Sequence, residues 1–258
     1  MEVCVLASGS KGNCIYVSGG GTSLLVDAGL SARELVKRMG AAGIDPESLH
    51  AVLFTHDHAD HFRGIEVFSR KYPVRLFANE GTASGIEANF PKASFAWEIF
   101  ETSAEFEIGG LRVEAFTVSH DASDPVGFVF DDGTSRLCLV TDLGQPSAVV
   151  RAKLARCHAA ILESNHDPDM LMASDRPWSL KTRIAGRSGH LSNDDAAELA
   201  GAAVPAQLHT LLLAHLSGEC NTAALALNTM RRALRAAGRA DIHVEVLSQE
   251  RVSARFRI

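Results

Sequence analysis

The feature that most constrains this chain is a run of five possible metal ligands within six residues, at positions 56 to 61. The apolar run Ala51 to Thr55 before it suits a buried strand. Side chains two apart in extended backbone project the same way, so His56 and His58 can bind one ion. Asp60 and His61 stand past the turn, where they face a second ion. A polar loop whose histidines merely cap a helix is the alternative, but packing gives no reason for such clustering, so the run predicts a two-metal site.

Composition predicts a globular protein with a sizeable core. The 258 residues, 46% hydrophobic and 22% charged, allow one large or two small domains, and we interpret residues 1–258 as a single domain. No signal peptide opens the chain and no apolar run approaches membrane-spanning length, so we expect a cytoplasmic protein without a membrane partner. The five cysteines lack C-x-x-C spacing, which indicates neither a disulfide framework nor a zinc ribbon. A net charge of -6 argues against indiscriminate coating of nucleic acid, although a local basic groove can operate on an acidic protein.

Apolar runs separated by turn residues predict strands that alternate with helices. Ser31 and Glu34 form a capping box for one helix, and Asp131 to Thr134 is a good hairpin turn. We expect strands at residues 2–7, 14–18, 22–27, 51–55, 74–78, 95–100, 111–119, 126–130, 136–141, 159–163, 211–214, 242–247 and 252–258. We expect helices at residues 31–39, from 62, at 80–89, 146–157, from 192 and at 222–237. The pattern favours an α/β (α+β) chain with two β-sheets covered outside by helices, an αββα sandwich.

Further possible ligands follow later strands of the predicted sheets. His120, Asp142 and His215 each stand where such a strand ends. Two ions need more ligands than one loop supplies. A lone histidine after a strand is more often an ordinary loop residue, but each of these three would help to complete a ligand shell. Because functional residues gather on loops at strand ends, we expect them beside the first cluster.

The run from Thr55 to His61 resembles the H-x-H-x-D-H signature of the metallo-β-lactamase superfamily. The resemblance implies that His56, His58 and His120 bind one ion, that Asp60, His61 and His215 bind the other, and that Asp142 bridges them. The β-lactamases of the best-known subclass carry Cys at the position of Asp142, and flavodiiron oxygen reductases carry Glu at the position of His58. These two differences disfavour a β-lactamase and an oxygen reductase. The hydrolases that remain are thioesterases resembling glyoxalase II, lactonases and phosphodiesterases, which use two cations and a bridging hydroxide.

Longer matches narrow the resemblance to the YycJ (WalJ) group of metallo-β-lactamase-fold nucleases. They cover nearly the whole chain and comprise Leu6 to Asn13, Thr55 to His61, Val118 to His120, Val140 to Asp142, Glu163 to Asp167, Gly189 to Asn193 and Ala214 to Ser217. The group is similar to DNA exonucleases that act on duplex ends, linked in some bacteria to DNA mismatch repair or cell-wall signalling. The resemblance implies a 5′-to-3′ DNA exonuclease with two divalent metal ions per chain, zinc or manganese.

Residues 176–190 form a basic segment with no acidic residue, which is unusual in a chain of net negative charge. The segment carries Arg176, Lys181, Arg183 and Arg187 and suits phosphate. We expect Arg183 and Arg187 to bind backbone phosphates of the substrate; a solvated loop is the alternative. Trp178 in the same segment is either a base-stacking side chain or a partly buried anchor.

Three more stretches contain candidate residues. The turn Ser8 to Asn13 could offer backbone amides and Asn13 to a phosphate, and a tight turn between strands explains it about as well. His166 and Asp167 could orient metal ligands, or could serve stability alone. His190, which precedes the helix expected from residue 192, would donate a proton or a hydrogen bond. Together with the carboxylates Asp60 and Asp142, it completes the expected catalytic residues.

These observations predict a hydrolase of nucleic acid, with DNA as the expected partner, in which a metal-bound hydroxide attacks phosphorus. A small-molecule phosphodiesterase or thioesterase of the same fold would instead show a narrow pocket with no basic path leading to it. A regulatory binding protein with a vestigial site is disfavoured because every expected ligand position is filled. Shells made only of histidine and aspartate hold both zinc and manganese, so both metals stay candidates.

Overall fold

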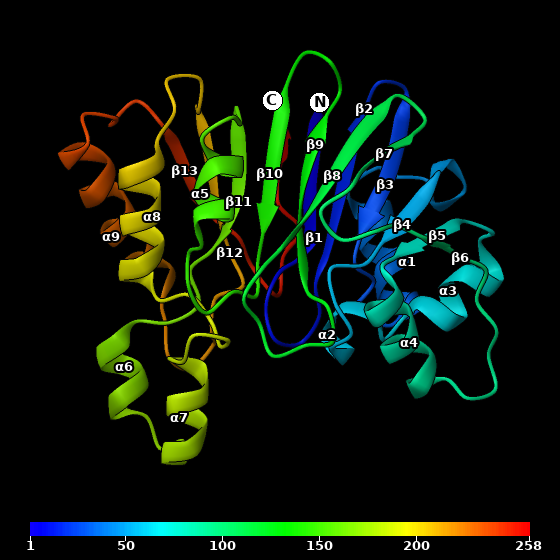
Figure 1. Cartoon of the computed structure of the whole chain (residues 1–258), viewed down its shortest axis with the longest axis horizontal. Helices are drawn as coiled ribbons and strands as arrows, with labels where there is room; N and C mark the ends of the chain where they lie inside the picture. Colours follow the sequence, from blue (N-terminus) through cyan, green and yellow to red (C-terminus); the bar gives the residue numbers. More distant parts are fainter.

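Two seven-stranded β-sheets make up the centre of the protein (Figure 1). The structure is a computed structural model, which describes residues 1–258 except for the side chain of residue 203. The first sheet has the order β14 (Arg255–Arg257), β1 (Glu2–Ala7), β2 (Cys14–Gly19), β3 (Thr22–Val26), β4 (Ala51–Leu53), β5 (Arg75–Ala78), β6 (Trp97–Ile99). The second has the order β13 (His243–Val246), β12 (Thr210–Ala214), β11 (Ala159–Glu163), β10 (Arg136–Val140), β9 (Val126–Asp131), β8 (Leu111–Thr117), β7 (Glu105–Ile108). Strands β3 to β6 pair in parallel in the first sheet, as do β10 to β13 in the second.

A hydrophobic core fills the space between the two sheets. Alternation along β9 shows how the strands supply it: Phe128 and Phe130 belong to this core, whereas Val129 between them packs with the helices outside. Val3 and Val5 of β1 enter the same core from the opposite sheet. Each sheet is therefore apolar on both faces, which explains why its strands have continuous apolar sequences.

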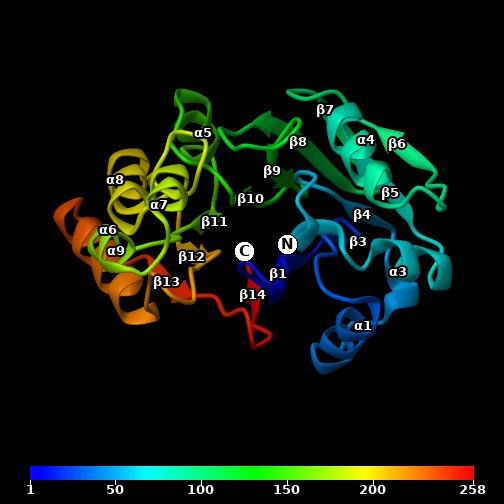
Figure 2. The same cartoon turned by 90° about the horizontal axis from the view of Figure 1, so that it is seen from below.

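Helices cover the outer face of each sheet, as Figures 1 and 2 show from two directions. On the first sheet lie α1 (Ala32–Ala41), α3 (Ile65–Lys71) and α4 (Glu80–Asn89), and on the second α5 (Ala148–Leu154), α8 (Asn193–Ala203) and α9 (Ala223–Ala236). Met39 and Phe68 pack onto the first sheet, and Val150 and Met230 onto the second. The predicted αββα sandwich is confirmed. Among the described residues, no helix combines the length and apolarity that crossing a bilayer requires.

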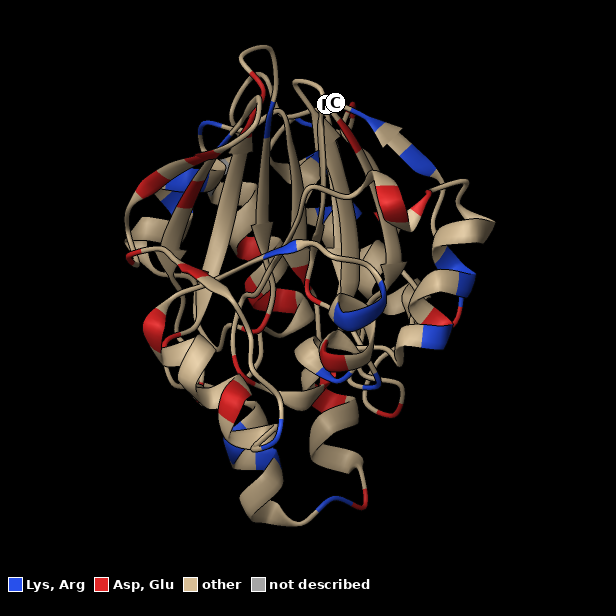
Figure 3. Cartoon of the chain, turned by 90° about the vertical axis from the view of Figure 1, so that its right-hand side faces the viewer, with Lys and Arg blue, Asp and Glu red and all other residues tan. Residues whose placement is uncertain are grey.

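Three short helices lie beyond the strands at one end of the molecule: α2 (Ala59–Phe62), α6 (Pro168–Ala173) and α7 (Trp178–Ile184). A 3-10 turn, η1 (Pro46–Ser48), precedes β4. Helices α6 and α7 project farthest, at the bottom of Figures 1 and 3, and acidic residues gather between them and the sheets. The loops that follow the parallel strands open toward this same end.

The structure agrees with most of the predicted elements and adds five that were not predicted. The strand at 159–163 and the helix at 80–89 have the predicted bounds. The helix expected from residue 62 is α3, which begins at Ile65. The separate four-residue helix α2 ends at Phe62 and contains Asp60 and His61, which were expected in a loop. The five additional elements are strand β7, helices α2, α6 and α7, and the 3-10 turn η1. The β7 sequence does alternate, since Glu105 and Glu107 are exposed while Ile108 is buried, whereas α6 and α7 are too short for a clear helical period.

Candidate metal centre

Strand ends bring the predicted ligands to one place. His56 follows β4, His120 follows β8, Asp142 follows β10 and His215 follows β12. Ligand atoms lie within 4.8 Å of one another in each of three sets: His56, His58 and His120; Asp60, His61 and His215; His56, His61 and Asp142. A fourth such set contains Asp142 and His215 together with Glu163 and His190. The structure thus gathers all seven predicted metal ligands, and adds two residues to their group.

The histidine run does not serve to cap a helix. His58 stands at the N-cap of α2, but its side chain accepts no hydrogen bond from that helix. Its Nδ1 atom lies 3.2 Å from Nε2 of His120, a residue 62 positions away in the sequence. The capping alternative is therefore wrong for this residue, whose ring faces the cluster.

Several atoms of the cluster are buried without a partner. Among the described side chains these atoms include Nε2 of His56, Oδ2 of Asp142 and Nε2 of His215. A buried polar atom left without a hydrogen bond costs about 1–3 kcal/mol. Imidazole nitrogen and carboxylate oxygen are the donors that zinc and manganese accept. Divalent cations beside these atoms would satisfy them, so the donor set fits metal binding.

Backbone conformation at the cluster is unusual. Asp27, Asp142 and His215 have φ angles of 63°, 56° and 55°. A residue with a Cβ atom pays roughly 1–2 kcal/mol for such a left-handed conformation, which persists where the surrounding structure imposes it. All three residues follow a buried strand and turn their side chains into the cluster. Backbone strain therefore occurs at residues whose side chains must point into the cluster.

Asp27 orients His61, a role that sequence reasoning missed. Oδ2 of Asp27 lies 2.8 Å from Nδ1 of His61. Thr55 fixes the carboxylate in turn, because its backbone N–H and its hydroxyl both donate to Asp27. Nε2 of His61 then faces Asp142 at 3.5 Å and Asp60 at 3.6 Å. The available signal was a carboxylate directly after the apolar strand 22–26.

Glu163 orients two histidines at once and was also missed. Its Oε1 accepts from Nδ1 of His190 at 2.8 Å and from Nδ1 of His215 at 2.9 Å. Its Oε2 accepts from the backbone N–H groups of Leu143 and Leu191. Although burial opposes ionisation, the two histidines hold the pKa of Glu163 well below its usual range. Both imidazoles therefore keep a proton on Nδ1 and present Nε2 to the cluster.

The neighbours of Glu163 do not share this role. Asp167, expected as an orienting group, accepts from the backbone N–H of Met170 at 2.9 Å and caps α6. Nδ1 of His166 is buried without a hydrogen-bond partner among the described residues. Within the stretch from Glu163 to Asp167, Glu163 therefore orients the histidines of the cluster, and His166 and Asp167 do not.

Carboxylates set the protonation of the histidines. Burial alone would lower the pKa of His61, but Asp27 and Asp142 outweigh it and raise this pKa to about 9. For His215, Asp142 and Asp60 likewise outweigh burial and raise the pKa well above its usual value. In contrast, burial and the neighbouring histidines hold the pKa of His56 well below 6.5. The negative potential that favours protons on two of these rings also favours a divalent cation.

We expect metal binding to release protons and to weaken as the pH falls. At neutral pH the raised pKa values leave His61 and His215 protonated, and a metal ligand must be neutral imidazole. Affinity should thus rise with pH up to about 9, the folded-state pKa of His61. Calorimetric titration of the protein with Zn²⁺ in two buffers of different ionisation enthalpy measures the protons released. An affinity that does not change with pH would contradict this expectation.

Asn13, the predicted phosphate ligand, supports the cluster from within. The residue is buried, and its Oδ1 accepts from the backbone N–H of Gly9 at 2.8 Å. Its Nδ2 donates to Oδ2 of Asp60 at 3.3 Å and lies 3.0 Å from Nε2 of His61. Gly29 allows this close packing, since a Cβ atom there would come within 1.6 Å of the Asp60 carbonyl oxygen. Asn13 therefore contacts two predicted metal ligands.

The basic segment is divided between structure and surface. Lys181 is buried and donates to the Met172 carbonyl at 2.6 Å, and Arg176 pairs with Glu219 at 2.9 Å. Arg183 is exposed and pairs with Asp121, next to His120. Arg187 is exposed and donates to Gln145 at 3.0 Å. The solvated-loop interpretation is wrong for residues 178–184, which form α7.

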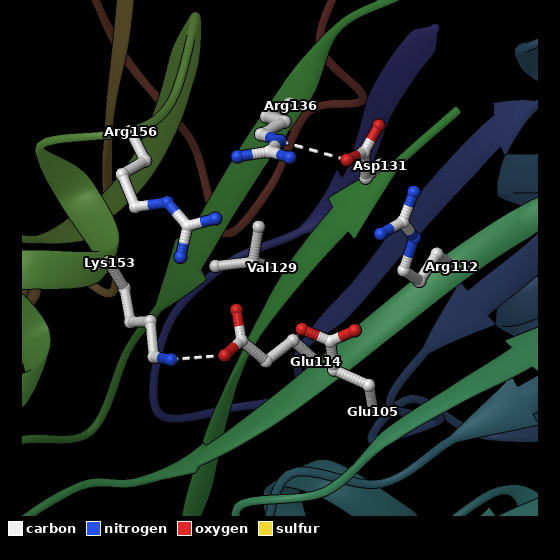
Figure 4. A pocket seen from close by; sticks show the side chains of 8 residues that line it. All are labelled: Glu105, Arg112, Glu114, Val129, Asp131, Arg136, Lys153 and Arg156. Carbon is white, nitrogen blue, oxygen red and sulfur yellow. Dashed lines mark hydrogen bonds and ion pairs between the residues drawn. The ribbon is translucent and has the colours of Figure 1, made fainter. Parts of the chain in front are cut away.

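A charged pocket lies elsewhere, between α5 and the strands β8, β9 and β10 (Figure 4). Its volume is about 30 Å³, and Arg112 and Arg156 point into it beside two ion pairs, Arg136 with Asp131 and Lys153 with Glu114. None of its lining residues belongs to the histidine cluster. Its charges largely cancel and its volume holds about one water molecule, so it offers no room for a substrate.

Comparison with known proteins identifies the class. The profile of the Beta-lactamase superfamily domain matches residues 22–215, and the chain belongs to this superfamily. It is 36% identical over 241 residues to the exodeoxyribonuclease YycJ of Bacillus anthracis, covering 92% of this chain and 90% of that one. It is 37% identical over 229 residues to the exodeoxyribonuclease WalJ of Streptococcus pneumoniae, covering 88% and 85%. The predicted resemblance to the YycJ and WalJ group is confirmed.

Solved structures agree on the fold. The metallo-β-lactamase fold protein YhfI from Bacillus subtilis superimposes with a TM-score of 0.74 at 16% identity, over 98% of each chain. The Zn²⁺-bound PqqB from Methylobacterium extorquens superimposes with a TM-score of 0.72 at 18% identity, over the whole of both chains. At these identities the comparison shows the architecture alone.

Proposed function

We propose that this chain is a binuclear-metal phosphodiesterase of nucleic acid, a DNA exonuclease that acts 5′-to-3′ on duplex ends. The observation that carries the proposal is the junction at Asp142. Its Oδ2 lies 3.5 Å from Nε2 of His61 and its Oδ1 lies 3.2 Å from Nδ1 of His215, and it also belongs to a set with His56. One carboxylate thus joins both groups of histidines. The names of the similar YycJ and WalJ proteins support DNA as the substrate.

We assign the metal ligands of this proposal to the three sets above. His56, His58 and His120 would hold one ion, Asp60, His61 and His215 the other, and Asp142 would contact both. Two divalent ions, zinc or manganese, supply a nucleophile at neutral pH and neutralise charge on a phosphate. The protein contributes the fixed direction of each ligand, through Asp27 for His61 and through Glu163 for His215.

His190 is the proposed proton donor. Its side chain is 20% exposed, whereas those of His61 and His215 are 0% and 3% exposed, so a substrate can reach it. Glu163 fixes its Nδ1, which leaves Nε2 to face a leaving group. Although burial acts against it, Glu163 raises the pKa of His190 above the usual value, which keeps an imidazolium available near neutral pH.

We further propose that residues 1–258 act as one domain, because side chains from both sheets share a single core between them. A DNA substrate would place the activity in the cytoplasm. The free state of all five buried cysteines accords with a reducing compartment.

A cleavage assay tests the proposal directly. Metal-replete protein is incubated with end-labelled duplex DNA, single-stranded DNA and RNA, and in parallel with a chromogenic thioester and a small phosphodiester. We expect stepwise shortening of duplex DNA from its 5′ ends. Hydrolysis of the thioester, with no nucleic acid cleaved, would instead identify a small-molecule hydrolase of the same fold.

Changing both Arg183 and Arg187 to Ala should weaken binding to all DNA sequences alike. If each arginine binds one phosphate, the slope of log affinity against log salt should fall by about two. The matched control is the double change of Arg231 and Arg232 to Ala, which removes the same charge from exposed positions of α9. An unchanged slope in the Arg183 and Arg187 variant would show that neither residue contacts phosphate.

A further inference from the structure

Trp178 is exposed without a structural reason. At 69%, it is the most exposed large hydrophobic side chain among the described residues. It is the first residue of α7, the helix that projects with α6 at the metal-centre end of the molecule (Figures 1 and 3). The anchor interpretation of the sequence is therefore wrong, because a buried ring would show little exposed surface. Indole exposed in this way is typical of a surface that stacks or docks a partner.

The helix that presents Trp178 is held firmly. Leu171 of α6 and Ile184 of α7 pack with Cys220 in a small buried cluster of their own. Lys181, itself buried, ties α7 to the end of α6 through its bond to the Met172 carbonyl. Trp178 is thus displayed on a preorganised support, and a ligand that contacts it need not order the chain first.

The other end of α7 adjoins the metal centre. The carbonyl of Ile184 accepts from the backbone N–H of His190 at 2.8 Å, and Arg183 pairs with Asp121 beside His120. At a helical rise of about 1.5 Å per residue, Trp178 and Ile184 are separated by about 9 Å along the helix. That distance corresponds to about three stacked nucleotides at about 3.4 Å each.

We propose that α7 guides an unpaired strand of nucleic acid from the metal centre, with a base stacked on Trp178; this proposal rests on the proposed nuclease function. Charge supports a polyanion. Residues 177–190 contain no carboxylate, in a chain whose net charge is -6, and two of their cations, Arg183 and Arg187, are exposed. An aromatic ring beside cations, along a path to the site, is the arrangement by which proteins hold single strands without reading their sequence.

Fluorescence tests this contact without relying on catalysis. The chain has two tryptophans, and Trp97 of β6, whose Nε1 donates to Glu87 of α4, is changed to Phe so that Trp178 alone reports. Metal-replete protein is titrated with oligothymidylate whose phosphorothioate linkages resist cleavage. We expect saturable quenching of Trp178. By a separate anisotropy measurement, Trp178→Ala should bind this oligonucleotide about tenfold more weakly, and Trp178→Phe should retain most of the affinity.

Val149→Ala is the matched control, because it trims a side chain that is 46% exposed on α5, away from α7. Its affinity should equal that of the wild type. Quenching that is absent at saturating oligonucleotide, or a Trp178→Ala variant that binds like the control, would overturn the proposal. Concentration-dependent dimerisation that disappears in Trp178→Ala would also overturn it, and would assign the surface to a second copy of the chain.

Kinetics separate this proposal from the proposed function. Duplexes with unpaired tails of increasing length should be cleaved with higher kcat/KM than blunt duplex, and Trp178→Ala should reduce this advantage about tenfold. If the wild-type protein cleaves blunt and tailed duplexes equally well, the proposed role of α7 in guiding an unpaired strand is wrong, whereas the proposed nuclease function is unaffected. If the wild-type protein binds the oligonucleotide through Trp178 but cleaves no nucleic acid, the proposed nuclease function is wrong, whereas the contact of Trp178 with an unpaired strand is supported.

Discussion

Asp142→Asn should lose bound metal and activity together. Asp142 is 2% exposed, contacts histidines of both groups and has a carboxylate oxygen without any other partner. An amide would keep the shape but remove the charge that balances two cations. Its NH₂ group would also point a donor where an electron pair is needed. We expect elemental analysis to find fewer than two ions per chain, and cleavage of duplex DNA to fall by at least about a hundredfold.

Asp57→Asn is the control for this change. Asp57 lies in the same histidine run, but its carboxylate accepts from the backbone N–H and the hydroxyl of Ser123 and belongs to none of the ligand sets. The control should keep its metal and its activity. If Asp142→Asn retained two ions and cleaved normally, the assignment of Asp142 as the shared ligand would be wrong.

The clustering of the proposed ligands could be predicted from the sequence because their positions follow local rules. Each lies at or just after the end of an apolar run, and parallel strands carry such ends to the same edge of a sheet. The structure accordingly gathers His56, His120, Asp142 and His215 into neighbouring ligand sets. The two-sheet architecture followed from the same alternation of runs and turns.

The residues that orient those ligands could not be predicted in the same way. Asp27 pairs with a histidine 34 positions away, and Glu163 pairs with histidines 27 and 52 positions away. Each is a carboxylate at a strand end, yet many carboxylates are. Which imidazole it meets depends on the order of the strands: β11, which ends at Glu163, lies between β10 and β12 and so between Asp142 and His215. Pairing of this kind is a property of topology, and no local pattern contains it.

Charge in the basic segment shows the same limit. In the sequence the four cations cannot be distinguished by role, but the folded structure buries or pairs two of them and exposes the other two. Lys181 turns inward to a carbonyl and Arg176 to Glu219, while Arg183 and Arg187 stay on the surface. The seven residues of α7 are too few for a reliable helical period, so sequence reasoning treated the segment as one loop. The exposed pair are the residues for which a phosphate-binding role was predicted.

His190→Ala should keep both metals and cleave DNA far more slowly. His190 lies beyond the seven proposed ligands, and Glu163 holds its ring at the more exposed side of the cluster. Without it, an alkoxide must leave phosphorus unprotonated, and the loss of a positioned acid typically costs on the order of a hundredfold or more. A nitrophenyl phosphodiester, whose leaving group needs no proton, should recover much of the rate.

Metal content decides between the two roles that His190 could have. His243→Ala, which removes a histidine that is 57% exposed on β13, provides the matched control and should resemble the wild type in metal content and rate. Retention of both ions with slow cleavage of DNA fits a proton donor. Loss of an ion would instead identify His190 as a metal ligand. Its Nε2 would bind the ion, because Glu163 holds Nδ1 of His190 and thereby directs Nε2 toward the cluster, as it also does for His215. In that event one of the seven histidine and aspartate assignments would have to be withdrawn, and Glu163 would be the group that orients metal ligands on both sides of Asp142.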